Sequence, residues 1–293
     1  MANPMRATVP VICVGNLVAG GAGKTPTALA IAARLQDHAP HFLIRGYRGN
    51  SAALVQVDPA RHTAREVGDE ALLLAAQAPT WASPDRRAAA RAAIAAGAKV
   101  LVMDDGFQNP GLAKDVSFVV IDQGYGLGNG RLLPAGPLRE SPSRGFARAS
   151  AVIMVDDAAG ISVPVDTGGL PTLAARLAPT PESVERLKGA RVMAFAGIGR
   201  PEKFFQSLRD LQCDVVATRG FPDHHAYSDG ELVALRADAL TTGARLVTTT
   251  KDLARLSPRA REGIEVLEVE MIFSEPSALY ALLAPVLTPG SVR

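Results

Sequence analysis

Residues 11–35 read VICVGNLVAGGAGKTPTALAIAARL, and this stretch decides the fold class. A β-branched run is followed by a glycine-rich turn, by Gly23-Lys24-Thr25 and by a segment rich in Ala and Leu. Glycines allow backbone N–H groups to converge on phosphate oxygens, and the N-terminus of the helix that follows adds a favourable dipole. The stretch therefore predicts a strand, a phosphate-binding loop and a helix in direct succession.

The spacing of the loop departs from the usual G-x-x-x-x-G-K-[ST] pattern, which requires glycine at position 18. This chain has Val18 there, and its glycines stand later, at Gly20 and Gly21. Lys24 can reach the β- and γ-phosphates of a nucleotide, and the Thr25 hydroxyl can ligate Mg²⁺. A glycine turn between strand and helix also occurs in α/β proteins that bind no phosphate. We predict that the loop binds a triphosphate through Val18, Ala19, Gly20, Gly21, Ala22, Gly23, Lys24 and Thr25.

The composition narrows the class of protein. A chain of 293 residues with 47% hydrophobic residues can bury the cores of two ordinary domains. The net charge of +2 creates no overall field for nucleic-acid binding, so anion recognition must be local. No apolar run reaches the roughly eighteen residues of a transmembrane helix, and no signal-peptide pattern is present. Cys13 and Cys213 lack metal-type spacing, which predicts reduced thiols in a reducing cytoplasm.

Short β-branched runs alternate with helical patterns in the first half of the chain, which is typical of a parallel sheet covered on both faces. Ligands of such sheets bind beyond the carboxyl ends of the strands. We therefore predict an α/β fold, with a P-loop NTPase-like parallel sheet domain and a second, smaller α/β domain. The strands expected in the first half are 11–14, 42–44, 100–103, 118–121 and 152–155, and the helices are 25–35, 69–77 and 84–96.

The alternation lapses in the Gly-, Pro- and Arg-rich stretch 124–150 and again at 158–169. Long irregular segments inside a compact domain are more often functional or mobile. Beyond Pro181 the alternation restarts, which predicts a nucleotide-binding domain over residues 1–180 and a smaller α/β domain over 181–293, with a cleft between them. The expected strands here are 192–196, 215–218, 246–249 and 264–269, and the expected helices are 201–211, 229–240 and 276–287.

Acidic residues stand where two of these elements begin or end. Asp104 and Asp105 follow a hydrophobic strand, and one of them is expected to face Mg²⁺, because adjacent strand residues point to opposite faces. A solvated strand end is the alternative. Asp69 precedes the helical run ALLLAAQA, where it can favour the helix dipole or accept the proton of an attacking hydroxyl, as kinases require.

Histidine and arginine residues add further polar groups. His224 and His225 follow Asp223, and we expect them to act at the domain cleft rather than to bind a metal, because adjacent histidines rarely ligate one metal. A plain turn is the remaining alternative. Arg45 and Arg48 follow another strand, so their guanidinium groups can recognise phosphate at the same sheet edge. Residues 248–252, TTTKD, can line the cleft or cap a helix.

Eight segments, in this order, resemble the tetraacyldisaccharide 4'-kinase family, the lipid A 4'-kinases of Gram-negative bacteria. They are VGNLVAGGAGKTP, RGYRG, VGDEALLLA, VMDDGFQNP, LLPAGPLRE, FAGIGRPEKFF, FPDHHAYS and VTTTKD. Together they cover nearly the whole chain, which makes the resemblance more specific than any single motif. The displaced glycines near Val18 also resemble the family's own version of the loop.

The resemblance implies transfer of the γ-phosphate of ATP to the 4'-hydroxyl of a tetraacylated glucosamine disaccharide 1-phosphate, which produces lipid IV-A. It implies two α/β/α domains with substrate in the cleft, and the cofactors ATP and Mg²⁺. Carried over by motif, Lys24 and Thr25 bind phosphates and Mg²⁺, Asp104 or Asp105 serves the metal, and Asp69 is the base. One of the two histidines assists. The residues predicted to contact substrate are Arg45, Tyr47, Arg48, Gln108 and Arg139.

The resemblance also implies a peripheral protein on the cytoplasmic face of the inner membrane, with no nucleic-acid or protein partner. Family members usually begin with an extra hydrophobic or amphipathic segment, whereas the phosphate-binding strand begins here at Val11. We therefore expect either that the chain begins late or that other surfaces provide the anchor. Apolar residues interspersed with arginines can meet anionic headgroups. They are Leu132, Leu133, Leu138 and Phe146, with Arg131, Arg139, Arg144 and Arg148.

Two other classes of protein compete with a kinase. A nucleotide-driven switch of the partitioning or metallochaperone type has a loop similar to residues 20–25, but often with an additional lysine just before the paired glycines, where this chain has Ala19. A non-catalytic membrane adaptor would leave Asp69 and the Asp104-Asp105 pair without a role.

Overall fold

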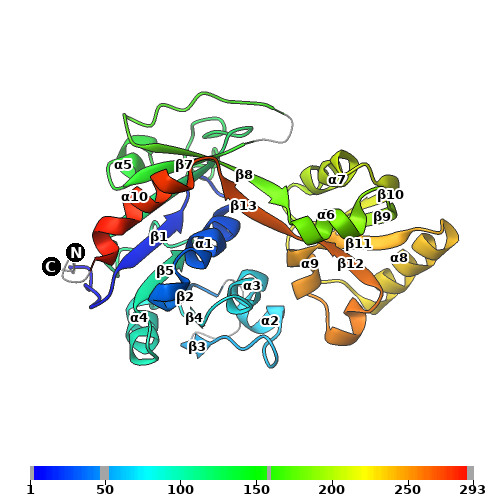
Figure 1. The fold of residues 1–293 in the computed structure, drawn as a ribbon, viewed down its shortest axis with the longest axis horizontal. Coiled ribbons are helices and arrows are strands. Elements are labelled where there is room, and N and C mark those ends of the chain that lie inside the picture. Colours follow the sequence, from blue (N-terminus) through cyan, green and yellow to red (C-terminus); the bar gives the residue numbers. More distant parts are fainter. Residues whose placement is uncertain (1–2, 47–52, 157–159, 289–293) are drawn as a thin grey trace.

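The computed structural model describes residues 3–46, 53–156 and 160–288 (Figure 1). Tyr47 and Arg48, two of the predicted substrate contacts, lie outside these ranges. The described residues form a nine-stranded sheet in the order β13-β8-β7-β6-β1-β5-β2-β4-β3 and a four-stranded sheet in the order β10-β9-β11-β12. Figure 1 shows the two sheets in separate bodies joined through β8 and β13.

The larger sheet is parallel from β4 to β8, and its edge strands β3 and β13 are antiparallel to their neighbours. The predicted parallel α/β fold is therefore confirmed. The strands of this sheet are β1 (Val11–Gly15), β2 (Pro40–Ile44), β3 (Val55–Gln56), β4 (Thr80–Ala82), β5 (Val100–Asp104), β6 (Val116–Asp122), β7 (Ala151–Val155), β8 (Thr172–Pro179) and β13 (Val269–Phe273).

Hydrophobic residues fill both faces of the larger sheet, because successive strand side chains point to opposite sides. Ile12 and Val14 of β1 enter one core, and Val11 and Cys13 enter the other. The helices outside the smaller sheet are α1 (Lys24–Ala33), the 3₁₀ turn η1 (Gln36–His38), α2 (Ala64–Val67), α3 (Asp69–Ala75), α4 (Arg86–Ala95), α5 (Pro142–Phe146) and α10 (Pro276–Leu287). Helices α1, α3 and α10 cover the first core, and α4 covers the second.

The smaller sheet is parallel throughout and also has a core on each face. Phe204 and Phe205 of α7 pack on one face, and Leu232 and Leu235 of α8 pack on the other. Its strands are β9 (Arg191–Ala196), β10 (Asp214–Gly220), β11 (Arg245–Thr249) and β12 (Ile264–Leu267). Its helices are α6 (Pro181–Leu187), α7 (Pro201–Asp210), α8 (Asp229–Thr241), α9 (Thr250–Ala254) and the 3₁₀ turn η2 (Pro258–Arg261).

The end of the chain departs from the expected organisation, in which residues 181–293 form the smaller unit. Residues 264–269, expected as one strand, divide between β12 in the smaller sheet and β13 in the larger one. Met271 and Phe273 of β13, with Leu279 and Leu283 of α10, enter a core of the larger sheet. The described chain thus passes from the larger body to the smaller one after β8 and returns at β13.

None of the helices in the described part of the chain combines the length and apolarity that crossing a bilayer requires.

Candidate functional site

The glycine-rich loop runs from the end of β1 to Lys24, the first residue of α1. Gly20 and Gly23 have φ values of 113° and 87°, in the left-handed region that favours glycine. Val18 instead forms an isolated antiparallel bridge to Leu138, and the Ala19 N–H donates to the carbonyl oxygen of Pro137 at 2.8 Å. Position 18 therefore needs no glycine, because the turn of this loop comes two residues later.

Lys24, Thr25 and Asp104 come together beneath this loop. The Thr25 hydroxyl donates to Asp104 Oδ2 at 2.8 Å, and Lys24 Nζ donates to the Gly20 carbonyl oxygen at 3.2 Å. Asp104 is fully buried, and its other carboxylate oxygen, Oδ1, has no hydrogen-bond partner among the residues that the structure describes. A buried carboxylate oxygen beside a hydroxyl is the hard-oxygen chemistry that Mg²⁺ prefers. These two side chains fit a magnesium ion next to the phosphate loop.

The electrostatics of Asp104 fit the same role. Burial, followed by the negative charges of Glu70 and Asp105, raises the pKa of Asp104 to about 7, although the hydrogen bond from Thr25 opposes the shift. An ionised carboxylate in such a place is costly unless a cation compensates it. The influence of Glu70 also shows that the start of α3 lies near the end of β5.

Asp105 comes directly after β5, so the alternation of strand side chains that was expected for this pair does not extend to it. Its φ is 49°, and its two oxygens accept hydrogen bonds from Arg139 at 2.9 and 3.3 Å. Lys24 Nζ lies 3.9 Å from Asp105 Oδ1. The paired acidic residues therefore have separate partners: Asp104 lies against Thr25, and Asp105 lies between Arg139 and Lys24.

Asp69, the first residue of α3, is buried at the contact between the two bodies. Its Oδ2 accepts a hydrogen bond from Arg255 Nε at 2.9 Å and also contacts Arg255 Nη2, while His224 Nδ1 lies 3.4 Å away. Within the described part of the chain, Asp69 Oδ1 accepts a hydrogen bond only from the backbone N–H of Glu70, at 3.0 Å. A role at the start of helix α3 thus explains the contact with the Glu70 N–H, whereas the other contacts of this carboxylate come from the smaller body.

Opposing effects set the charge of Asp69. Burial by itself would raise the pKa of Asp69, but the positive charges of Arg255 and Lys251 outweigh it, so the pKa lies below its ordinary value. The Asp69 carboxylate is therefore ionised at neutral pH.

The side chains of the two adjacent histidines contact different residues. His224 faces Asp69, and its backbone N–H donates to the Gly197 carbonyl oxygen at 3.0 Å. His225 Nε2 instead lies 3.0 Å from Glu231 Oε1, and its ring stacks on Phe221 with centroids 4.7 Å apart. The structure does not bring His225 to Asp69, so only one of the two predicted histidines lies at this site.

Of the other residues predicted to contact substrate, two bind groups of the protein itself and a third is exposed. Gln108 Nε2 donates to the Asn16 carbonyl oxygen at 2.8 Å and to Glu140 Oε1 at 3.1 Å, and Arg139 binds Asp105, so both support the phosphate loop. Arg45 is exposed just after β2.

Among the described residues, sequence reasoning placed Lys251 at the cleft, within residues 248–252, and missed three other cations that join the two bodies. Arg200 Nη2 donates to the Gly21 carbonyl oxygen at 2.9 Å and to Asp122 Oδ2 at 2.6 Å, and Lys203 Nζ reaches the same Asp122 oxygen at 2.9 Å. The third is Arg255, while Lys251 Nζ lies 2.6 Å from Glu70 Oε1. All four lie in or just after the segments FAGIGRPEKFF and VTTTKD, at helices that follow strands, a position that could have marked them.

Part of the segment 124–150 lies against the phosphate loop. Some of its residues that were expected to meet the membrane are therefore not available for that contact. Leu138 and Phe146 are buried, and Arg139 and Arg148 are paired with Asp105 and Glu140, so these four do not form a free surface. Leu132, Leu133, Arg131 and Arg144 are exposed.

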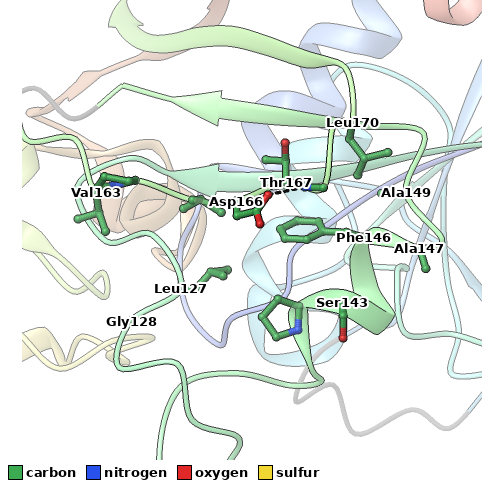
Figure 2. Close-up of a pocket in the computed structure, with 14 residues that line it drawn as sticks. Leu127, Gly128, Ser143, Phe146, Ala147, Ala149, Val163, Asp166, Thr167 and Leu170 are labelled. Carbon is green, nitrogen blue, oxygen red and sulfur yellow. Dashed lines mark hydrogen bonds between the residues drawn. The ribbon is translucent and has the colours of Figure 1, made fainter.

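An open groove of about 770 Å³ lies beside this segment. Figure 2 shows Phe146 and Ser143 of α5 facing Leu127, Asp166 and Thr167 across it. The groove contains none of the residues predicted to bind phosphate, metal or the acceptor hydroxyl.

Comparisons with known proteins agree with this geometry. The family model described as tetraacyldisaccharide-1-P 4'-kinase matches residues 1–288. A tetraacyldisaccharide 4'-kinase of Rhodospirillum centenum is 53% identical over 287 residues, which cover 97% of this chain and 85% of the relative. One from Paramagnetospirillum magneticum is 50% identical over 284 residues, which cover 96% and 87%.

A crystal structure of LpxK from Aquifex aeolicus, described as an "apo" form in complex with ATP, matches with a TM-score of 0.80 and 28% identity. The match covers 98% of this chain and 91% of that chain. The P-loop kinase fold and the resemblance carried by the eight segments are thereby confirmed. The chain belongs to the tetraacyldisaccharide-1-P 4'-kinase family.

Proposed function

We propose that this chain transfers the γ-phosphate of ATP to the 4'-hydroxyl of a tetraacyldisaccharide 1-phosphate, forming lipid IV-A in lipid A biosynthesis. The observation that carries the proposal is the meeting of Asp69 and His224 close to the edge of the larger sheet where the phosphate loop ends. Phosphoryl transfer needs positioning and charge neutralisation more than covalent chemistry, and this inventory supplies both.

The phosphate loop is proposed to hold the triphosphate through the backbone N–H groups between Val18 and Thr25, with Lys24 at the β- and γ-phosphates. Thr25 and Asp104 are the residues that would hold Mg²⁺, because Asp104 Oδ1 is buried and has no partner in residues 3–46, 53–156 and 160–288. A bound Mg²⁺ would neutralise charge on the phosphate oxygens.

Asp69 is the proposed base. The Asp69 carboxylate is ionised, and the hydrogen bond that its Oδ1 accepts from the backbone N–H of Glu70 leaves this oxygen a lone pair for the 4'-hydroxyl proton. His224 stands beside Oδ2 and orients the carboxylate from the other body. A proton leaves the hydroxyl for Asp69 as the new O–P bond forms and the bond to the ADP leaving group breaks.

We propose different roles for the residues that were predicted to contact substrate. Arg45 is exposed at the end of β2 and is our candidate for recognition of a substrate phosphate. Gln108 and Arg139 act through the phosphate loop and Asp105. The larger and smaller sheets form the two domains of this kinase, with the acceptor bound where Asp69 meets His224.

We also propose peripheral binding to the cytoplasmic face of the inner membrane, through the exposed residues Leu132, Leu133, Arg131 and Arg144. Arg131→Glu with Arg144→Glu is expected to abolish flotation of the protein with vesicles that contain anionic lipid. Unchanged flotation would discard this surface.

One assay tests the reaction. The protein is incubated with ATP labelled at the γ-phosphate, Mg²⁺ and detergent-dispersed tetraacyldisaccharide 1-phosphate, and the label is followed into lipid. We expect labelled lipid. Label found only in inorganic phosphate would indicate a nucleotide switch, and label in neither product would indicate an adaptor; both results contradict the proposal.

A further inference from the structure

Arg255 is a buried cation that spans the two bodies. It is the C-cap residue of α9, and its side chain is 7% exposed. Its Nε and Nη2 bind Asp69 Oδ2, and its Nη1 donates to the Gly197 carbonyl oxygen at 2.6 Å and to Asp252 Oδ1 at 2.8 Å. A buried cation is costly unless its donors are satisfied, and these contacts place the guanidinium in one orientation.

The Gly197 carbonyl oxygen is shared between Arg255 and His224. The backbone N–H of His224 donates to it at 3.0 Å, and the Gly197 N–H donates to Asp252 Oδ1 at 2.9 Å. A Cβ at Gly197 would lie 3.0 Å from both His225 Cβ and the Tyr227 hydroxyl, so this backbone is tightly enclosed. Arg255 therefore contacts Asp69 directly and holds the carbonyl group on which His224 is placed.

We propose that Arg255 is a positioning residue for phosphoryl transfer, which fixes Asp69 Oδ2 and the Gly197 carbonyl group and thereby brings Asp69 and His224 together. The inference rests on the proposed function of Asp69. Because Asp69 comes from the larger body and His224 from the smaller one, their separation depends on a group that binds both sides. The planar guanidinium does this with donors on two edges, whereas the ammonium group of lysine is a single point.

The neighbouring pair Lys251–Glu70 offers a matched control. It joins the same two helices, α9 and α3, and Lys251 lies four residues before Arg255. Lys251 Nζ contacts Glu70, and no hydrogen bond joins Lys251 to Asp69 or Gly197 among the described residues. Loss of this pair therefore weakens docking of the two bodies without removing the guanidinium bridge.

The test compares Arg255→Gln with Lys251→Met in the lipid phosphorylation assay at saturating ATP and Mg²⁺. We expect Arg255→Gln to lower kcat about 100-fold with an unchanged KM for ATP, because the phosphate loop is intact. Lys251→Met is expected to lower kcat less than about fivefold. Equal losses in the two variants, or a wild-type kcat in Arg255→Gln, would overturn the inference.

The pH dependence of kcat supplies a readout that a purely structural role would not move. The charged and titratable groups around Asp69 are Arg255, Lys251 and His224, with Glu70 beside it in α3. Removal of Arg255 is expected to raise the pKa of Asp69, so the acid limb of the profile moves to higher pH. A lower kcat with an unmoved acid limb would assign Arg255 to stability alone.

Two controls keep the outcomes separate. If Arg255→Gln lacks a cooperative melting transition, Arg255→Lys takes its place, with the same loss of kcat expected and the same contrary results. If the wild-type protein transfers no label to lipid, the proposed function fails. If the wild type is active and Arg255→Gln does not differ from Lys251→Met, only the role of Arg255 fails.

Discussion

The two buried carboxylates of this site contrast in origin and in charge. Asp104, at the end of β5, meets Thr25 of α1 within the larger body, whereas Asp69 meets Arg255 and His224 where the two bodies touch. Burial raises the pKa of Asp104 to about 7, while the surrounding cations lower the pKa of Asp69. Environments that shift the pKa values of two carboxyl groups in opposite directions suit them to different tasks, which supports our proposal that Asp104 accommodates a cation and Asp69 acts as an ionised base.

The largest effect should come from removal of the base. Asp69→Asn keeps the size of the side chain and is expected to lower kcat about 1,000-fold, since a positioned base contributes roughly 10²–10⁴-fold. Label transfer to lipid measures it. Glu70→Gln, which changes the adjacent carboxylate, is the matched control and should retain most of the activity. A wild-type rate in Asp69→Asn would show that Asp69 is not the base and that it acts only at the start of helix α3.

Asp104→Asn sharpens the contrast in charge. We expect kcat to fall about 100-fold, with a higher Mg²⁺ concentration needed for half-maximal activity, because the amide lacks the carboxylate charge. A carboxyl whose pKa is raised in the folded state stabilises the fold while protonated, and this stability is lost as the pH rises through about 7.

Without nucleotide and Mg²⁺, Asp104→Asn should therefore unfold with a free energy about 1–3 kcal/mol higher than the wild type at pH 8, and with nearly the wild-type value at about pH 4, close to the ordinary pKa of an aspartate. Denaturant titration at both pH values measures the difference. Equal stability at pH 8 would show that ionised Asp104 is not costly in this fold.

The histidines test whether the contact between the bodies matters. His224→Gln is expected to lower kcat about tenfold, because it removes the imidazole beside Asp69. His225→Gln, the matched control, should change kcat less than about threefold. It should also lower the melting temperature, because it loses the contacts with Glu231 and Phe221. Equal losses of kcat in the two variants would contradict the prediction that His224 alone acts beside Asp69.

The smallest effect concerns the loop spacing. Val18→Gly restores the common glycine position but removes a buried side chain that bridges Leu138. We expect the melting temperature to fall by about 2–5 °C, since the change costs roughly 1–2 kcal/mol, while the KM for ATP changes less than about threefold. A large rise in KM would show that Val18 helps shape the phosphate site.

Several elements were predictable because their signals are local. The strand, glycine turn and helix of residues 11–35 follow from neighbouring residues, and the strand preceding Asp104 is recognisable as an apolar run. The division of 264–269 was not, because β12 and β13 differ only in which sheet they join. The burial of Leu138 and Phe146 was missed for the same reason, since their partners lie elsewhere in the chain.

The sequence by itself determined the phosphate loop, the parallel α/β fold and the family, because glycine conformations, strand patterns and ordered motifs act over short separations. Only the tertiary structure decided that Asp104 lies against Thr25, that His224 and not His225 faces Asp69, and that Arg255 joins them. Each of these contacts depends on how two bodies dock or on which face of an element is buried. Such contacts join residues up to 186 positions apart, a separation at which sequence spacing carries no geometric information.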